Sequence, residues 1–173
     1  MKLLFLCCFL IFACLSQAKK YVYKEDEYKA SLKAWQDLKS KAYTFVMVDA
    51  GEFRTGRTTI KVRNGQVVSR KYVQTKTYHL PHEVVESWSE TTPQTIGSHE
   101  GGYPVSTFDE VYADCIENIL TQKYKDDPWE NPENPRYFGD LKVDENGLLS
   151  LCAFYHDYGI WGNVINVESI RYC

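Results

Sequence analysis

Residues 43–73 read YTFVMVDAGEFRTGRTTIKVRNGQVVSRKYV, and this stretch decides how the rest of the chain is interpreted. From Tyr43 to Val48 the side chains alternate with a period of two, which is typical of a strand with one packed face. Residues 59–63 and 66–72 then flank Asn64-Gly65, a dipeptide that tolerates positive φ at both central positions of a type I′ turn. The stretch therefore predicts a three-strand meander.

The hairpin also predicts which side chains share a face. With Asn64-Gly65 as a two-residue loop, Val62 opposes Val67, and both lie with Ile60 on one face of the sheet. The opposite face is then expected to carry three cations, which are Lys61, Arg63 and Arg70.

Charge is distributed unevenly along the chain, whose formal net charge is −3. Residues 53–82 contain seven basic residues and no acidic one, whereas residues 83–173 contain five basic and seventeen acidic residues. Such a cationic island favours a site for a sulfated glycan, an acidic protein or a lipid headgroup, because summed charge steers association. The competing interpretation is a sheet face that is solvated or paired with the acidic C-terminal half. The candidate binding residues are Arg54, Arg57, Lys61, Arg63 and Arg70.

The first eighteen residues have the layout of a secretory signal peptide. A single early cation is followed by the apolar run LLFLCCFLIFACL and then by the small residues Ser16 and Ala18. The run is too short for a membrane-spanning helix of about 20 residues, and no second run follows. A bacterial lipoprotein signal at Cys14 is disfavoured by the bulky Phe12. We therefore expect residues 19–173 to form one secreted, extracellular domain, which disfavours nucleic acid as a partner.

Two helices are expected. Residues 24–42 place apolar side chains at intervals of four, three and three, which lines them along one side of a helix. Thr107 and Glu110 match a capping box that opens a second helix ending at about Lys123. The apolar side of the first helix is Tyr28, Leu32, Trp35 and Leu38, and that of the second is Phe108, Val111, Tyr112, Cys115, Ile116 and Ile119.

The remaining elements follow from turn residues. Residues 137–143 and 148–155 flank the turn 144–147 as a second hairpin, and residues 164–172 supply a last strand after a turn at 159–162. Residues 78–104 are a long turn-rich loop, in which Val84, Val85 and Trp88 indicate a helical turn or short strand. The order is helix, three strands, helix, three strands. It predicts a single α+β domain in which an antiparallel sheet of five to six strands packs with two helices.

Several of these segments resemble a functionally uncharacterised family of small secreted proteins found in bacteria and animals. The similarity is carried by Trp35, the Tyr-rich first strand, the Asn-Gly hairpin and the segment STFDEVY at 106–112. The phrases GLLSLCAFY and GNVINVESI are similar to the C-terminal half of the animal members. The resemblance implies an α+β domain and assigns no catalytic or binding residue.

Three cysteines follow the signal segment, which allows one internal bridge and one leftover thiol in an oxidising compartment. Cys115 lies on the apolar side of the second helix, and Cys152 lies in a strand that this helix should cover. We therefore predict a Cys115–Cys152 disulfide. The terminal Cys173 is then free or links two chains as a covalent dimer.

No nucleophile elbow, phosphate loop or metal-ligand spacing occurs, so the sequence favours a non-catalytic binding or extracellular structural protein without a cofactor. One alternative is a hydrolase with its site on the 78–104 loop, which requires His79, His82 and His99 to converge with Glu83 or Glu100. Another alternative is a component of an extracellular matrix or biomineral. Cys152 and His156 cannot form a thiol dyad, because four residues of a strand separate them by about 13 Å.

Overall fold

The computed structural model describes residues 25–77, 83–120, 137–156 and 159–172. The expected signal segment, residues 1–18, lies outside these residues, as do His79, His82, Trp129 and Cys173. The first half of the chain folds as α1 (Glu25–Leu38), β1 (Ala42–Ala50), β2 (Arg54–Arg63), β3 (Gln66–Lys76) and β4 (Val84–Glu90). The second half contributes α2 (Phe108–Asp114), a π-helical continuation η1 (Cys115–Leu120), β5 (Tyr137–Val143), β6 (Leu149–His156) and β7 (Gly159–Tyr172).

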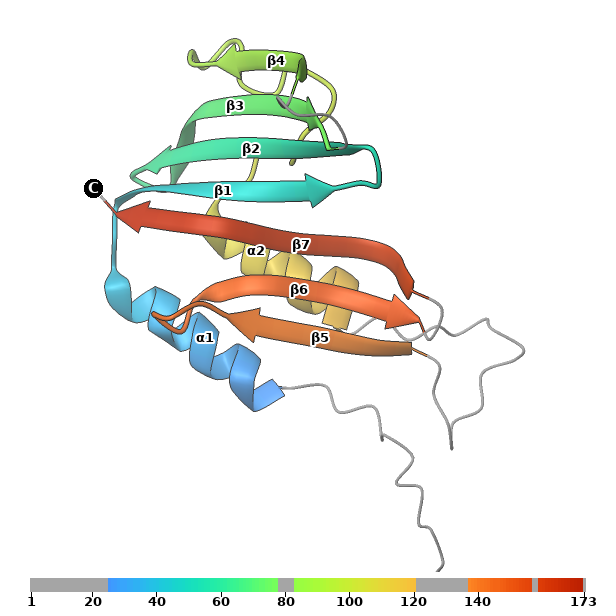
Figure 1. Ribbon diagram of the computed structural model, residues 1–173. Helices are drawn as coiled ribbons and strands as arrows, with labels where there is room; N and C mark the ends of the chain where they lie inside the picture. The colour runs from blue at the N-terminus through green and yellow to red at the C-terminus, as the bar shows by residue number, and fades with distance from the viewer. Residues whose placement is uncertain (1–24, 78–82, 121–136, 157–158, 173) are drawn as a thin grey trace, which may run out of the picture.

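The strands form one open antiparallel sheet in the order β4-β3-β2-β1-β7-β6-β5 (Figure 1). The N-terminal meander and the C-terminal meander meet where the first strand, β1, pairs with the last strand, β7. The predicted α+β class is confirmed, but the sheet has seven strands where five to six were expected. The additional strand is β4, which lies within the segment that the sequence presented as a loop.

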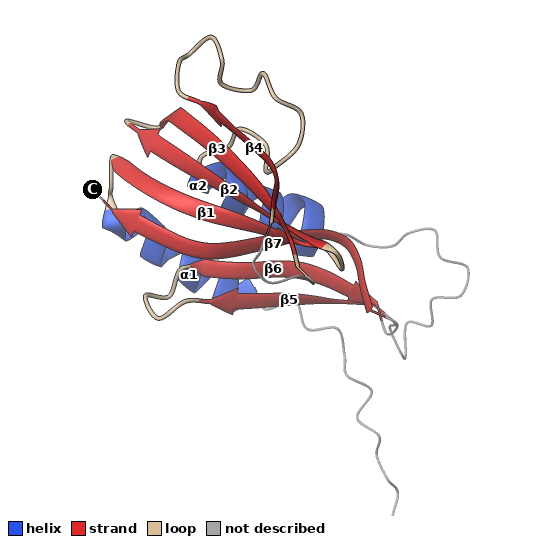
Figure 2. Cartoon of the chain, turned by 45° about the horizontal axis from the view of Figure 1, so that its top comes forward, coloured by secondary structure: helices blue, strands red, loops and turns tan. Residues whose placement is uncertain are grey.

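Both helices cover one face of this sheet, and no helix of the described residues lies on the other face (Figure 2). The apolar side chains of the helices pack there against alternate residues of the strands, including Phe45, Ile60 and Ile165, which are each at most 1% exposed. Tyr28 and Trp35 of α1 are buried as the helical spacing predicts, whereas Leu38 at its end is exposed. We call the two sides of the sheet the helix face and the open face.

The expected second helix begins where the sequence indicates. The Thr107 hydroxyl accepts from the Glu110 amide while the Glu110 carboxylate accepts from the Thr107 amide, so the predicted capping box is confirmed. The α-helical hydrogen bonding ends at Asp114 and continues as the π-helix η1. The predicted apolar side is buried along both parts, apart from the half-buried Ile116.

Both hairpins are confirmed. Asn64 and Gly65 have φ values of 50° and 74°, as a type I′ turn requires, and Val62 pairs with Val67. The second hairpin joins β5 to β6. The turn expected at 159–162 is wrong, because β7 already begins at Gly159 and those residues belong to the strand.

The predicted disulfide is present between Cys115 and Cys152, whose Cα atoms lie 5.8 Å apart. Both cysteines are fully buried at the start of η1 and on the helix face of β6. The bridge therefore fixes the second helix to the C-terminal half of the sheet. It also leaves Cys152 without a thiol for nucleophilic chemistry.

Candidate functional site

The open face of the sheet carries exposed basic side chains from β2, β3 and β7. Strand register places them: Lys61 of β2 and Arg171 of β7 both pair with Thr44 of β1, so the three residues form one row across the sheet. Lys71 of β3 pairs with Thr59, two residues along β2 from Lys61. Arg63 also lies on β2, two residues from Lys61 in the direction away from Thr59. We call Lys61, Arg63, Lys71 and Arg171 the cation cluster; all four are exposed.

No carboxylate of the described residues forms an ion pair with a member of the cation cluster. Arg57, which lies on the same face, differs because its Nε donates to both carboxylate oxygens of Glu168 at 3.1 Å. This pair is nearly half exposed, so its Coulomb energy is largely screened. Arg57 is nonetheless partly neutralised, and the net positive charge concentrates on the cluster beside it.

The structure separates the five basic residues that the sequence grouped as one site. Arg57, Lys61 and Arg63 lie on the open face, whereas Arg54 shares the side of Gly56 and Thr58 and donates to the Gln74 side chain. Arg70 is only 4% exposed and lies on the helix face. The expectation that Arg70 shares a face with Lys61 and Arg63 is therefore wrong.

A β-bulge is the reason for this error. Val62 pairs with Val67, but Lys61 pairs with Ser69, so Val68 is an extra residue in β3. One inserted residue reverses the two faces for the rest of the strand. Arg70 is thereby turned to the helix face and Lys71 to the open face. Because of this reversal, Lys71 was not among the predicted binding residues. Arg171 was not among them either, because nothing in the sequence pairs β7 with β1.

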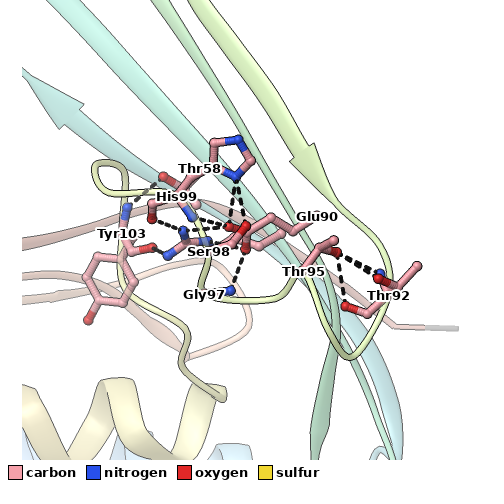
Figure 3. Close-up of polar contacts among 9 residues, drawn as sticks. Thr58, Glu90, Thr92, Thr95, Gly97, Ser98, His99 and Tyr103 are labelled. Carbon is pink, nitrogen blue, oxygen red and sulfur yellow. Dashed lines mark hydrogen bonds and ion pairs between the residues drawn. The ribbon is translucent and has the colours of Figure 1, made fainter.

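On the helix face, Arg70 forms the centre of a buried polar cluster with Glu90. Figure 3 shows the loop 91–107 folded around the Glu90 carboxylate. The Arg70 guanidinium donates to both oxygens of the fully buried Glu90 at 3.0 and 3.1 Å, and also to the carbonyls of His99 and Tyr103. It lies 4.6 Å from the centroid of the Trp88 ring, a cation–π distance. The contacts with Glu90 and Trp88 join β3 to β4, and those with His99 and Tyr103 join β3 to the loop.

Glu90 also binds the loop 91–107 through hydrogen bonds. Its carboxylate accepts from the backbone amides of Gly97 and His99, both at 2.8 Å, and lies 3.1 Å from Nδ1 of the His99 ring. Burial by itself raises the pKa of a carboxyl, but the two amides, the Arg70 guanidinium and the His99 ring together lower the pKa of Glu90 to about 2. Glu90 is therefore ionised and fully occupied in holding the loop.

These contacts bear on the hydrolase alternative. His99 stacks on Trp88 with an interplanar angle of 8° and shares its Nδ1 with Glu90, so this imidazole is oriented by a carboxylate as a general base would be. The hydroxyl of the neighbouring Ser98 also lies 3.3 Å from Nδ1. The serine and the carboxylate therefore contact the same nitrogen of the His99 ring and not two different ones. Glu83 pairs with Lys76. Because His79 and His82 lie outside the described residues, the proposed convergence of three histidines stays a prediction.

A small pocket of about 170 Å³ lies beside this loop, lined by Met47, Val48, Asp49, Thr58, Gly102, Tyr103, Pro104 and Val164. The Tyr103 amide donates to the Thr58 hydroxyl at 2.8 Å, and burial raises the pKa of the Tyr103 phenol, which also contacts the Asp114 carboxylate. Two of the polar groups that line the pocket, the Tyr103 amide and the Thr58 hydroxyl, thus bond to each other.

Replacing Gly102 by alanine is expected to destabilise the protein more than the same change at Gly101. Both glycines have positive φ, which costs other residues about 1–2 kcal/mol. A Cβ on Gly102 would also lie 2.8 Å from the Thr58 hydroxyl and 2.9 Å from the Tyr72 ring, and both side chains are buried. Overlap of this kind adds about 1–3 kcal/mol. Denaturant unfolding measures the difference, and equal losses for Gly102→Ala and Gly101→Ala would contradict the packing described.

Comparisons of the chain with protein-family models, with curated proteins and with solved structures find no match. In the described part of the chain, no helix has the length and apolar character needed to cross a membrane. The same residues contain no group of three or more histidine, cysteine or acidic side chains placed to hold a metal ion. The exposed cation cluster and the buried cluster around Arg70 and Glu90 are therefore the features of this chain that bear on its function.

Proposed function

We propose that this protein is a secreted binding protein whose open sheet face recognises an anionic partner. The observation that carries the proposal is the cation cluster: four exposed basic side chains from three strands, with no ion-paired carboxylate among the described residues. A group of like charges that is not neutralised within the protein attracts a partner of opposite charge and accelerates encounter.

Two further features support this assignment. The chain opens with the layout of a signal peptide, and a disulfide such as Cys115–Cys152 is compatible with an oxidising extracellular compartment. By contrast, the other ionic cluster, around Arg70 and Glu90, is buried and its groups bond to one another. A surface for a partner is thus better supported than a reaction centre.

Retention on an anionic polymer tests the proposal. The full secreted chain is expected to bind immobilised heparin at low salt, and Lys61→Gln/Lys71→Gln is expected to elute at a clearly lower salt concentration, since screening weakens exposed charges. The control is Lys29→Gln/Lys33→Gln, which changes net charge equally on exposed positions of α1. Passage of the unmodified protein through the column at low salt would refute the proposed function. Equal losses for the two double variants would refute its location.

A further inference from the structure

The arrangement of the cation cluster indicates the class of partner, an inference that rests on the proposed function. The cations of the cluster are spaced apart instead of converging. Arg171 lies two strands from Lys61, about 10 Å away, because neighbouring strands are about 4.8 Å apart. Lys71 is a diagonal neighbour of Lys61 at about 7–8 Å, and Arg63 lies about 7 Å along the same strand. This spacing suits a ligand with repeated charges better than one isolated anion.

The side chains between the cations are small and rich in hydroxyls. Lys61 has Ser69 on one side in its row and Thr44 on the other. Lys71 lies between Ser89 and Thr59. These hydroxyl groups can donate to or accept from sulfate and sugar oxygens while the cations bind the charges. The hydroxyl side chains of this part of the open face are Thr44, Thr59, Ser69, Ser89 and Ser169.

An acidic protein would be recognised differently. Protein interfaces depend on buried aromatic and large apolar anchors near their centre. The rows that hold the cation cluster contain none of the exposed large apolar side chains of the described residues; Tyr172, next to Arg171, pairs with Tyr43 and so lies on the helix face. This part of the open face, which carries cations and hydroxyl groups with the half-buried Val46 between Thr59 and Ser169, therefore matches an extended, polar polymer.

We propose that the ligand is a sulfated polysaccharide that lies across strands β3, β2, β1 and β7, with Lys71, Lys61 and Arg171 binding its charged groups and Thr44 and Thr59 bonding to its oxygens. Glu168 limits the extent of the site, because it holds Arg57 at the adjoining end of the open face. The same contact predicts a variant that binds more tightly than the natural chain.

Solution binding of the full secreted chain to a heparin octasaccharide and to polyglutamate tests this inference. We expect Lys61→Gln, Lys71→Gln and Arg171→Gln each to weaken octasaccharide binding by about two- to five-fold, and Glu168→Gln to strengthen it to a similar degree. Thr44→Val and Thr59→Val keep shape and charge, so each is expected to weaken octasaccharide binding by about two- to ten-fold without affecting polyglutamate. Lys33→Gln is the matched control and is expected to change neither.

The outcomes separate the two claims. If the chain binds neither polymer, the proposed function fails and the polysaccharide assignment fails with it. If polyglutamate binds as tightly as the octasaccharide, or if the two threonine variants leave octasaccharide binding unchanged, the open face still binds anions but the polysaccharide assignment is wrong. Stronger octasaccharide binding by Glu168→Gln cannot arise from misfolding, so this variant keeps the test decisive even where a loss is ambiguous.

Discussion

Arg70→Met is expected to lower the free energy of unfolding by about 3–5 kcal/mol, the usual cost of removing one partner from a buried ion pair. The substitution leaves the Glu90 carboxylate, which is fully buried, without its two guanidinium bonds. It also removes the donors to the carbonyls of His99 and Tyr103, so the loop 91–107 loses these two hydrogen bonds to β3. Chemical denaturation with a constant m-value measures the loss.

The control for this prediction is the double variant Arg70→Met/Glu90→Gln. Because it removes the unpaired charge, it should be more stable than the sum of the two single losses predicts, and strict additivity would contradict a coupled pair. Acid titration gives a second check. The pKa of Glu90 is lowered from 4.5 to about 2, so its contribution is fully present above about pH 4.5 and is lost as the pH falls towards 2. Relative to the natural chain, Glu90→Gln should lose a pH-dependent contribution of at most about 3 kcal/mol in that window.

Removal of the disulfide is also expected to lower the stability of the protein. Cys115→Ala/Cys152→Ala should lose about 2–4 kcal/mol, because a bridge between residues 37 positions apart restricts the unfolded chain. Both sulfurs are buried between η1 and β6, so the alanines also leave a small cavity. The midpoint of thermal unfolding measures the effect under oxidising conditions.

Reduction of the natural chain provides the comparison for that double variant. Reduction removes the covalent link without creating the cavity, so the reduced chain should be less stable than the oxidised chain but more stable than the double variant. If Cys115→Ala/Cys152→Ala unfolds at the same temperature as the oxidised natural chain, the bridge does not contribute to stability. A peptide map in which Cys152 is joined to Cys173 would contradict the pairing itself.

The local features of this fold could be predicted from sequence, because each has a short-range physical cause. Asn64-Gly65 sets the hairpin through positive φ, and Thr107 with Glu110 sets the start of α2 through mutual hydrogen bonds. The pairing of Cys115 with Cys152 followed from helical periodicity and from the expectation that a helix covers the sheet.

The features that sequence reasoning missed depend on tertiary contacts. The bulge at Val68 has no local signature, and it alone moves Arg70 from the open face to the buried cluster. At β4 the sequence left a helical turn and a short strand open, because this edge strand is mostly exposed and its apolar alternation is weak. Arg171 joins the cation cluster only because β7 pairs with β1, a contact between segments that lie far apart in the sequence. Two members of the candidate site, Lys61 and Arg63, could therefore be predicted from the charge pattern. Lys71 and Arg171 could be assigned to it only from the strand register.

The pairing of β1 with β7 also constrains how the chain can fold. The N-terminal meander, β1 to β4, can form from neighbouring segments, but β1 then presents a free edge until the last strand has been synthesised and has docked. Contacts between such distant segments raise the contact order and slow folding, and an exposed central edge invites pairing with another chain in the meantime. Completion of the sheet, and assembly of the cation cluster that spans it, therefore wait for the final residues of β7.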